Sequence, residues 1–390
     1  MNNFNYRRVT RFVFGKETET AVGRLIKNEG GTKVLIVYGG GSAVKSGLID
    51  TVKKALDDES IHYCEISGVQ PNPLDDLVYE GINICKEEGI DFLLGVGGGS
   101  VIDTAKAISI GALYDGDFWN FYGKKEKVLK ALPVSTVCTI AAAGSEGSGS
   151  SVITQKKTKL KRSCKSELIV PVFSVLNPEL TMTLPEYQTS CGITDMLAHV
   201  MERYFTNTKG VELTDRLCEG TMKAVVNEAY KLIENPSNYD ARANIMWAGV
   251  VAHNNSIGMD REQDWSSHKI EHELSGMFNI AHGAGLAIIF PAWMKYVMNH
   301  DISRFVQFAH RVWDVDVDYH DLPMTALKGI SQYEKFMRDI HMPIRLSEVG
   351  ITESDIDNLI KKLGLKDGET TGSFVELTKE DIKNIYKLAL

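Results

Sequence analysis

The sequence has little of what marks membrane, secreted or nucleic-acid-binding proteins. It contains no run of about eighteen apolar residues, and the N-terminal MNNFNYRRVTRFVFG has no long apolar core, so we expect neither a membrane span nor a secretion signal. Its 51 acidic residues outnumber its 43 basic ones, which argues against nucleic acid or an anionic membrane as the main partner. The six cysteines are scattered without a Cys-x-x-Cys pair, so we expect reduced thiols and a cytoplasmic protein.

Apolar residues, by contrast, are plentiful. Hydrophobic residues make up 43% of the chain and charged residues 24%, an ordinary globular composition that does not suit a disordered protein. A chain of 390 residues is long enough for two substantial domains, each with its own core.

The first half of the chain alternates β-branched runs with helix-like segments. Strands are predicted at 11–14, 33–38, 61–66, 91–96 and 132–137. This βαβ rhythm predicts a parallel sheet with helices on both faces and ligands bound beyond the carboxyl ends of its strands. A Gly/Ser-rich passage (141–154) and a lysine-rich loop (156–165) follow, and from about Pro185 strand signals almost vanish. We therefore predict a Rossmann-like α/β domain over residues 1–185 and an all-helical domain over residues 186–390.

Two glycine-rich turns each follow a predicted strand. In GVGGGSVIDTAK, Gly98 and Gly99 let a ligand approach the backbone, and a helix beginning near Ser100 aims free N–H groups at it, so a pyrophosphate fits. The alternative is a tight turn in which Ser100 and Asp103 form a capping box. The second turn, YGGGS at 38–42, offers no acid to an adenosine ribose, so we expect NADP(H) to be favoured, with NAD(H) as the alternative.

Three of the ten histidines stand within residues 268–282. His268 and His272 are four apart, so on a helix they share one face. The helix breakers Ser275 and Gly276 follow, and His282 is predicted to open a second helix that returns beside the first. The alternative is three unrelated core or surface histidines.

A matching acid stands in GITDMLAHVME at 192–202, where Asp195 and His199 are four apart in an otherwise apolar segment. An ionised aspartate on so apolar a helix needs a cation or a donor to offset its desolvation. An ordinary Asp/His pair on a solvated stripe is the alternative. Taken together, the two segments favour a metal site made of Asp195, His199, His268 and His282.

These motifs resemble those of the iron-containing alcohol dehydrogenase family. The resemblance lies in GGGSVID at 97–103, in the Asp195 and His268 segments, and in the closing His282-Gly283; YGGGS and QDWSSH resemble the butanol dehydrogenase and broad-specificity aldehyde reductase branch. It covers nearly the whole chain. It implies a dehydroquinate synthase-like fold, with an N-terminal dinucleotide-binding domain, a helical C-terminal domain and a cleft between them. It also implies a homodimer joined through N-terminal strands.

The resemblance also implies roles for residues. By motif position it assigns the metal to Asp195, His199, His268 and His282, and it places His272 beside the nicotinamide as a catalytic residue that is not a ligand. It assigns cofactor contacts to Gly39, Gly40, Ser42, Asn72, Gly98, Gly99, Ser100, Asp103, Thr136, Thr139, Ser145 and Lys161. Relatives commonly have a threonine-rich run before Gly-Ser-Glu, but this chain has TVCTIAAAGSE, which leaves fewer hydroxyls on the nicotinamide side.

The implied activity is reversible hydride transfer between NAD(P)H and a small-molecule aldehyde or primary alcohol. Fe²⁺ is the metal that the resemblance implies, and three imidazoles with one carboxylate also suit Zn²⁺, Co²⁺ or Ni²⁺. His272 is a candidate for proton relay or nicotinamide positioning.

Three other interpretations compete with a dehydrogenase. HKIEH matches the H-x-x-E-H pattern of inverted zinc peptidases, with Glu271 as general base, but that reading leaves Asp195, His199 and both glycine turns without a function. A non-redox sugar-phosphate lyase of the same fold would need extra phosphate contacts among the helices. A nucleotide-binding protein without catalysis would not need four intact metal ligands.

Overall fold

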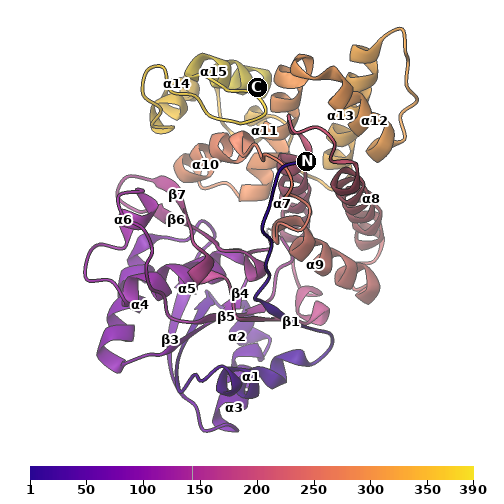
Figure 1. Ribbon diagram of the computed structural model, residues 1–390. Coiled ribbons are helices and arrows are strands. Elements are labelled where there is room, and N and C mark those ends of the chain that lie inside the picture. Colours follow the sequence, from indigo (N-terminus) through magenta and orange to yellow (C-terminus); the bar gives the residue numbers. More distant parts are fainter. Residues whose placement is uncertain (143) are drawn as a thin grey trace. The chain divides into compact units, whose positions relative to one another are not determined.

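The computed structural model describes residues 1–142 and 144–390 of the chain. These residues form two compact units, which Figure 1 shows in indigo to magenta and in pink to yellow. One unit comprises Arg7–Leu184, and the other comprises Pro185–Leu390 together with Met1–Tyr6. The first is an α/β unit, and the second is helical.

The α/β unit is built on a parallel sheet of six strands in the order β1-β8-β5-β4-β2-β3. The strands are β1 (Arg11–Phe14), β2 (Lys33–Gly39), β3 (His62–Val69), β4 (Phe92–Gly97), β5 (Val134–Cys138) and β8 (Phe173–Leu176). The five strands predicted from the sequence are all present. The sixth, β8, was not predicted from the sequence.

Helices cover both faces of this sheet, as the βαβ rhythm predicted (Figure 1). They are α1 (Val22–Asn28), α2 (Ser42–Lys45), α3 (Leu48–Asp57), α4 (Asp75–Glu88), α5 (Gly99–Ala112) and α6 (Trp119–Tyr122), with 3-10 turns η1 (Thr18–Ala21), η2 (Ser145–Gly147), η3 (Glu167–Ile169) and η4 (Pro178–Thr181). Successive side chains of a strand point to opposite faces. In β2, Val34 and Ile36 share a core with residues of α1 and α3, whereas Leu35 and Val37 share one with residues of α4 and α5.

A second, antiparallel pair of strands follows β5. It consists of β6 (Ser150–Gln155) and β7 (Leu160–Lys165). The prediction of a lysine-rich loop over 156–165 was therefore wrong for its second half. Charge alone suggested a solvated segment, but Lys161 is buried and donates a hydrogen bond of 2.9 Å to Oδ1 of Asn72, so its ammonium group is satisfied inside the unit.

The regular elements of the second unit are helices among its described residues, apart from one isolated bridge between Thr371 and Leu377. Its elements are α7 (Glu186–Tyr204), α8 (Glu212–Glu234), α9 (Tyr239–His253), α10 (Ser266–Phe278), α11 (His282–Val297), α12 (Ile302–Trp313), α13 (Leu322–Asp339), α14 (Glu353–Lys362), α15 (Lys379–Leu388), η5 (Met298–His300) and η6 (Leu346–Val349).

The link between α10 and α11 corrects one prediction and supports another. Ser275 and Gly276 do not break α10, which runs on to Phe278 and ends at Asn279 in the left-handed conformation, with φ of 54°. Ser275 is tolerated inside the helix because its hydroxyl is bonded to the Glu271 carboxylate one turn earlier. His282 is the first residue of α11, as predicted.

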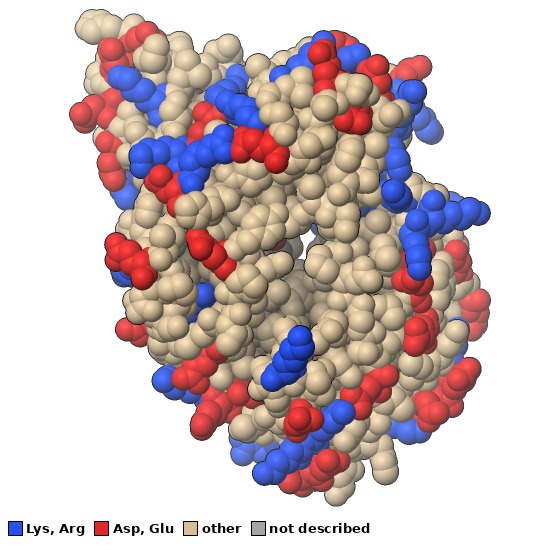
Figure 2. All heavy atoms as spheres, turned by 180° about the vertical axis from the view of Figure 1, so that it is seen from behind, with Lys and Arg blue, Asp and Glu red and all other residues tan. Residues whose placement is uncertain are grey.

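Two surface findings bear on partners. Among the described residues, no helix is long and apolar enough to cross a membrane. On the face shown in Figure 2, Lys and Arg side chains are interspersed with Asp and Glu and do not gather into one basic patch.

Candidate active site

Three of the four predicted metal ligands come together in the helical unit. Asp195 of α7, His268 of α10 and His282 of α11 each offer one ligand atom, and these atoms lie within 4.8 Å of one another. Oδ1 of Asp195 is 3.9 Å from Nε2 of His268 and 3.8 Å from Nε2 of His282. Two atoms that each lie about 2.1 Å from one ion are at most about 4.2 Å apart, so these spacings permit a shared cation.

Burial leaves two of these atoms without a hydrogen bond. Nε2 of His268 and Oδ1 of Asp195 are buried and make no hydrogen bond among the described residues, and the one ion-pair contact of Oδ1 shorter than 3.5 Å there is with Nδ1 of His199, at 3.0 Å. A buried acceptor without a partner costs about 1–3 kcal/mol, so such atoms persist where something else compensates them. A divalent cation between them fits that requirement.

His199, the fourth predicted ligand, stands beside this group. Its ring centroid is 4.5 Å from that of His268, and its Nδ1 lies 2.8 Å from the main-chain oxygen of Asp195. Because a carbonyl oxygen only accepts, Nδ1 of His199 carries the proton and Nε2 keeps the lone pair that a metal needs. His199 is outside the three-atom group but has the right tautomer to join it.

The protonation states of the other ligands also suit a metal. Burial by itself would raise the pKa of Asp195, but the surrounding histidines hold that pKa below its usual value, so the carboxylate is ionised. Burial lowers the pKa of His268 well below its usual value, so the imidazole is neutral. A carboxylate and a neutral imidazole are the forms that bind cations.

Glu202, which the sequence analysis did not single out, holds His268 in place. Its Oε1 accepts hydrogen bonds from Nδ1 of His268 at 2.7 Å and from the His268 main-chain N–H at 3.1 Å, and Oε2 accepts from Trp265 N–H at 2.6 Å. Burial raises the pKa of Glu202 to about 7, although these donors favour its ionised form. Its position on the same apolar helix, seven residues after Asp195, was the signal that could have revealed it.

Glu271 plays the same part for His282. One of its carboxylate oxygens is bonded to Nδ1 of His282 and the other to the Ser275 hydroxyl. Carboxylates on the outer nitrogen of ligand histidines fix their tautomer and ring orientation. With both oxygens engaged, Glu271 is not placed to act as the general base that the peptidase interpretation requires.

His272 stands apart from Asp195. Its ring centroid is 5.5 Å from that of His282, and its side chain is half-buried. It joins a second group of possible ligand atoms, with Glu271 and His282, but not the group that contains Asp195 and His268. This arrangement agrees with a residue near the centre that is not a ligand.

Two glycines let α11 carry His282 to this centre. A Cβ at Gly283 would overlap the main-chain oxygen of Cys191 on α7, and a Cβ at Gly285 would overlap the side chain of Glu271 on α10. The first turn of α11 therefore lies against the backbone of α7 and against the Glu271 side chain of α10. Larger residues would push His282 away from Asp195.

The two glycine-rich turns of the α/β unit meet at one edge of the sheet. Strands β2 and β4 are parallel neighbours, with Val37 opposite Gly95, and each ends in such a turn. The chain runs from β2 to β3 on one side of β2 and then to β4 on the other, so the strand order reverses there. Dinucleotides bind at such a switch point. The predicted contacts that come to this edge are Gly39, Gly40, Ser42, Gly98, Gly99 and Ser100.

The capping box predicted for the glycine turn at the start of α5 is absent, since no side chain caps that helix. Asp103 does not bond to the start of α5: Oδ1 accepts from the Ser145 hydroxyl at 2.6 Å, and Oδ2 accepts from the Val152 N–H at 2.9 Å. Both oxygens are thus engaged by a segment that follows β5. The predicted contact of Asp103 with a cofactor remains a prediction, as does that of Ser145.

The other predicted cofactor contacts differ in exposure. Lys161 and Asn72 are bonded to each other, and Asn72 has a positive φ of 54°. Thr136 is fully buried and donates its hydroxyl to Ser174, whereas Thr139 is half-buried. Of the two threonines, Thr139 is therefore the more accessible to a ligand.

The turn at 38–42 contains no acid, but one carboxylate lies near it. Oε2 of Glu65 on β3 accepts a hydrogen bond of 3.0 Å from the hydroxyl of Tyr38, the residue before the first glycine. Lys53 pairs with the same carboxylate at 2.8 Å. The negative charge beside the turn is therefore compensated by a cation.

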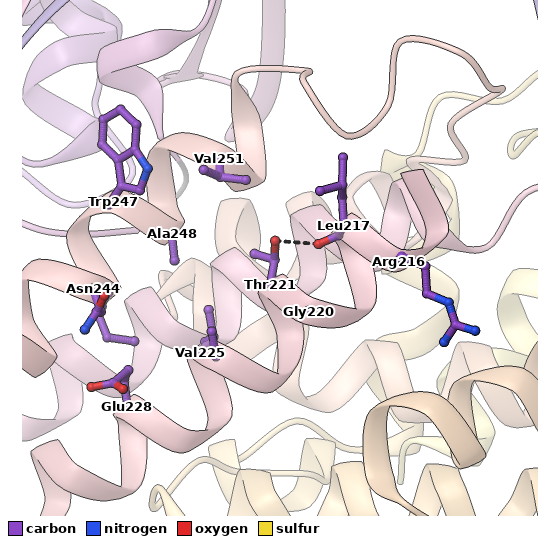
Figure 3. Close-up of a pocket in the computed structure, with 12 residues that line it drawn as sticks. Arg216, Leu217, Gly220, Thr221, Val225, Glu228, Asn244, Trp247, Ala248 and Val251 are labelled. Carbon is purple, nitrogen blue, oxygen red and sulfur yellow. Dashed lines mark hydrogen bonds between the residues drawn. The ribbon is translucent and has the colours of Figure 1, made fainter. Parts of the chain in front are cut away.

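A separate hollow of about 330 Å³ lies between α8 and α9 (Figure 3). Leu217, Trp247 and Val251 are among the side chains that line it. None of the predicted site residues is among them, so we assign it no part in the chemistry.

Comparison with known proteins decides the family. Residues 9–178 match the sequence profile described as "Iron-containing alcohol dehydrogenase", and residues 189–390 match the one described as "Fe-containing alcohol dehydrogenase family, C-terminal". The chain belongs to the iron-containing alcohol dehydrogenase family. Family membership makes it an oxidoreductase that interconverts alcohols and aldehydes, the reaction class predicted from the sequence.

Its relatives lie in the branch that the sequence motifs indicated. The probable NADH-dependent butanol dehydrogenase 1 of Bacillus subtilis (strain 168) is 41% identical over 390 residues, which cover both chains completely. The NADPH-dependent aldehyde reductase YqhD of Escherichia coli (strain K12) is 35% identical over 392 residues, again the whole of both chains. The crystal structure of NADH-dependent butanol dehydrogenase A from Thermotoga maritima matches with a TM-score of 0.96 at 40% identity, covering 100% of this chain and 99% of that one. The predicted fold class is thereby confirmed.

Proposed function

We propose that this enzyme reduces small aldehydes to primary alcohols with NADPH, at a divalent metal centre held by Asp195, His199, His268 and His282. One observation carries the proposal. Oδ1 of Asp195 and Nε2 of His268 are buried, make no hydrogen bond in the described chain and lie 3.9 Å apart, within reach of a third ligand atom from His282. Nδ1 of His199 forms an ion-pair contact of 3.0 Å with the same Oδ1.

Each residue of the centre has a defined task. When bound, the cation supplies a Lewis acid for the oxygen of the aldehyde or alcohol. Asp195 contributes a negative charge, and Glu202 and Glu271 hold His268 and His282 with the proton on Nδ1 and the lone pair on Nε2. Fe²⁺ is the proposed metal, and the donor set also accommodates Zn²⁺, Co²⁺ and Ni²⁺, since no cysteine belongs to the group among the described residues.

His272 is the proposed catalytic residue. It stands one helical turn after His268 and is only half-buried, so its ring is accessible to a small molecule. Reduction of a carbonyl group requires a proton as well as a hydride, and an imidazole near neutral pH is able to supply one. We assign His272 to this proton or to holding the nicotinamide ring.

NADPH is proposed over NADH because of the turn at 38–42. A 2′-phosphate there meets Gly39, Gly40 and Ser42, and the nearby carboxylate of Glu65 is paired with Lys53. The relatives named above include both NADH- and NADPH-dependent enzymes. The test is Gly39→Asp, which the fold accommodates because a Cβ at this position makes only ordinary contacts. An added carboxylate should lower kcat/KM for NADPH about tenfold or more and spare NADH.

We also propose a homodimer joined through β1. This strand lies at one end of the parallel sheet, next to β8, where a second copy of the strand could extend the sheet. Light scattering during size-exclusion chromatography measures the oligomer directly. Val13→Pro should yield monomers if the two strands pair through their backbones, and an unchanged dimer would place the interface elsewhere.

The whole proposal is tested by following NADPH and NADH oxidation with aldehydes from acetaldehyde to octanal, after loading with Fe²⁺ or Zn²⁺. Wild-type enzyme should turn over with at least one aldehyde, and His268→Ala should lose both bound metal and activity. His310→Ala, an exposed histidine of the same unit, is the control and should keep both. Normal turnover by His268→Ala would end the assignment of the metal centre.

A further inference from the structure

A buried lysine outside the metal centre has no part in the chemistry described so far. Lys106 of α5 is fully buried, with no exposed surface. Its Nζ lies 2.6 Å from the main-chain oxygen of Ser145, 2.9 Å from the Ser145 hydroxyl, 2.8 Å from Ser148 O and 2.9 Å from Ser150 O. All four acceptors belong to residues 145–150, a segment distant from α5 in sequence.

Asp103, one turn earlier on α5, binds the same segment as a hydrogen-bond acceptor, whereas Lys106 binds it as a donor. Its carboxylate accepts from the Ser145 hydroxyl at 2.6 Å and from the Val152 N–H at 2.9 Å, and its main-chain oxygen accepts from the Ser151 hydroxyl at 2.7 Å. An ammonium group and a carboxylate therefore hold residues 145–152 from one face of one helix. We call this pair and its contacts the α5 clasp.

The charge and the hydrogen-bond donors of Lys106 are compensated within the α5 clasp and its neighbour Glu146. Burial lowers the pKa of Lys106 to about 8, while the carboxyl groups of Asp103 and Glu146 oppose that shift. The ammonium group has three N–H donors for four acceptors, so its donors are all used within the protein. Removing it would leave three buried carbonyl oxygens with fewer donors and the buried Asp103 carboxyl group without its neighbouring cation, which a fold tolerates only by letting the segment move.

The clasp joins two elements that carry predicted dinucleotide contacts. The start of α5 is the turn with Gly98, Gly99 and Ser100, and the other segment contains Ser145. A dinucleotide that touches both needs them at a fixed separation before it binds. A segment that had to be ordered on binding would weaken affinity by its ordering cost.

We propose that Lys106 is a positioning residue for the dinucleotide: it fixes residues 145–150 relative to the glycine turn of α5 and thereby sets cofactor affinity. The inference rests on the proposed function, with the dinucleotide bound at the contacts predicted for these two elements. Lys106 itself touches neither cofactor nor substrate, because its donors are consumed inside the protein.

The test compares Lys106→Met with Ser109→Ala. Methionine keeps the length of the side chain but has no charge and no donor. Ser109 is an equally buried residue of α5, and its hydroxyl bonds only to the main-chain oxygen of Lys106 within the helix. Three quantities are measured: hydrogen–deuterium exchange of residues 145–152, the Kd for NADPH without aldehyde, and KM for NADPH and for the aldehyde.

We expect Lys106→Met to speed exchange at 145–152, to raise the Kd and KM for NADPH about tenfold, and to leave the aldehyde KM and bound metal unchanged. Ser109→Ala should match wild type in all of these. A folded Lys106→Met protein with wild-type exchange or wild-type NADPH affinity would overturn the role of Lys106. If Lys106→Met does not fold, Lys106→Arg is compared with wild type by the same measurements. The planar guanidinium group of arginine cannot reproduce the contacts of the compact ammonium group, so the same changes are expected.

The outcomes separate this inference from the proposed function. Wild-type protein that binds neither NADPH nor NADH would overturn the proposed function and the role of Lys106 with it. Wild-type protein that binds NADPH as tightly as Lys106→Met does would overturn the role of Lys106 alone.

Discussion

Glu202 and His268 are joined by a hydrogen bond of 2.7 Å between Oε1 and Nδ1, although 66 residues separate them in the chain. The bond directs the lone pair of His268 Nε2 toward the side on which Asp195 Oδ1 lies, 3.9 Å away. A residue that cannot itself reach the centre thus determines which nitrogen of His268 faces it.

This relationship predicts the effect of Glu202→Gln. An amide is a weaker acceptor than a carboxylate and no longer fixes the tautomer, so affinity for the metal should fall about 10–100-fold. Competition with a chelator of known strength measures this affinity. Glu234→Gln, at an exposed glutamate of the same unit, should leave it unchanged. Equal affinities in the two variants would contradict a supporting role for Glu202.

Gly283→Ala should separate the helices that form the centre. The new Cβ would overlap the main-chain oxygen of Cys191, so α11 must move away from α7, and we expect a loss of about 1–3 kcal/mol in unfolding free energy together with weaker metal binding. Gly220→Ala is the matched control, because a Cβ there meets nothing within 4 Å. It should be neutral or slightly stabilising in urea unfolding, since alanine favours a helix.

His272→Ala should keep the metal and lose rate. His272 does not belong to the group of ligand atoms around Asp195, so metal content should equal that of wild type. Loss of a group that handles the proton should lower kcat about a hundredfold. Steady-state kinetics across a range of pH, with metal analysis of the same samples, checks both statements. Loss of the metal would show that His272 is a ligand, and wild-type kinetics would dismiss the catalytic role.

The raised pKa of Glu146 predicts that the free energy of unfolding depends on pH. Burial raises the pKa of Glu146 to about 7 from 4.5, so the folded protein binds a proton that the unfolded chain releases between these values. The contribution of this group to stability is complete below the unfolded pKa and is lost as the pH rises through about 7. Between about pH 5 and about pH 8, wild type should lose on the order of 2 kcal/mol more unfolding free energy than Glu146→Gln.

Urea unfolding at the two pH values measures this difference. Glu126→Gln, at an exposed glutamate of the same unit, is the control and should follow wild type. If Glu146→Gln also follows wild type, the Glu146 side chain is not protonated in the fold.

Local pattern was enough to predict much of this enzyme. Asp195 and His199, and likewise His268 and His272, share a helix face because the helical repeat places residues four apart together. The central strands β2 and β4 are largely apolar and buried, since both faces of the sheet are covered there. The glycine turns followed these two strands, and parallel neighbours end at the same edge.

Predictions from local sequence pattern were wrong where a side chain forms a hydrogen bond that the pattern does not show. Residues 156–165 were predicted to form a lysine-rich loop, but residues 160–165 form β7, and Lys161 within it donates a hydrogen bond to Asn72, 89 residues away. Asp103 had the spacing of a capping residue, but Ser145 and Val152 take both of its oxygens. Ser275 looked like a helix breaker, but Glu271 accommodates its hydroxyl within α10.

The sequence by itself determined which side chains were able to bind a metal, in what order and on which helix faces, because those properties repeat over a few residues. Only the tertiary structure decided which carboxylate holds which histidine, why Gly283 must be glycine and what Lys106 grips. All three features depend on contacts between segments that are far apart in the chain. The geometry of such contacts is set by the packing of whole helices, and the spacing of residues along the sequence does not encode it.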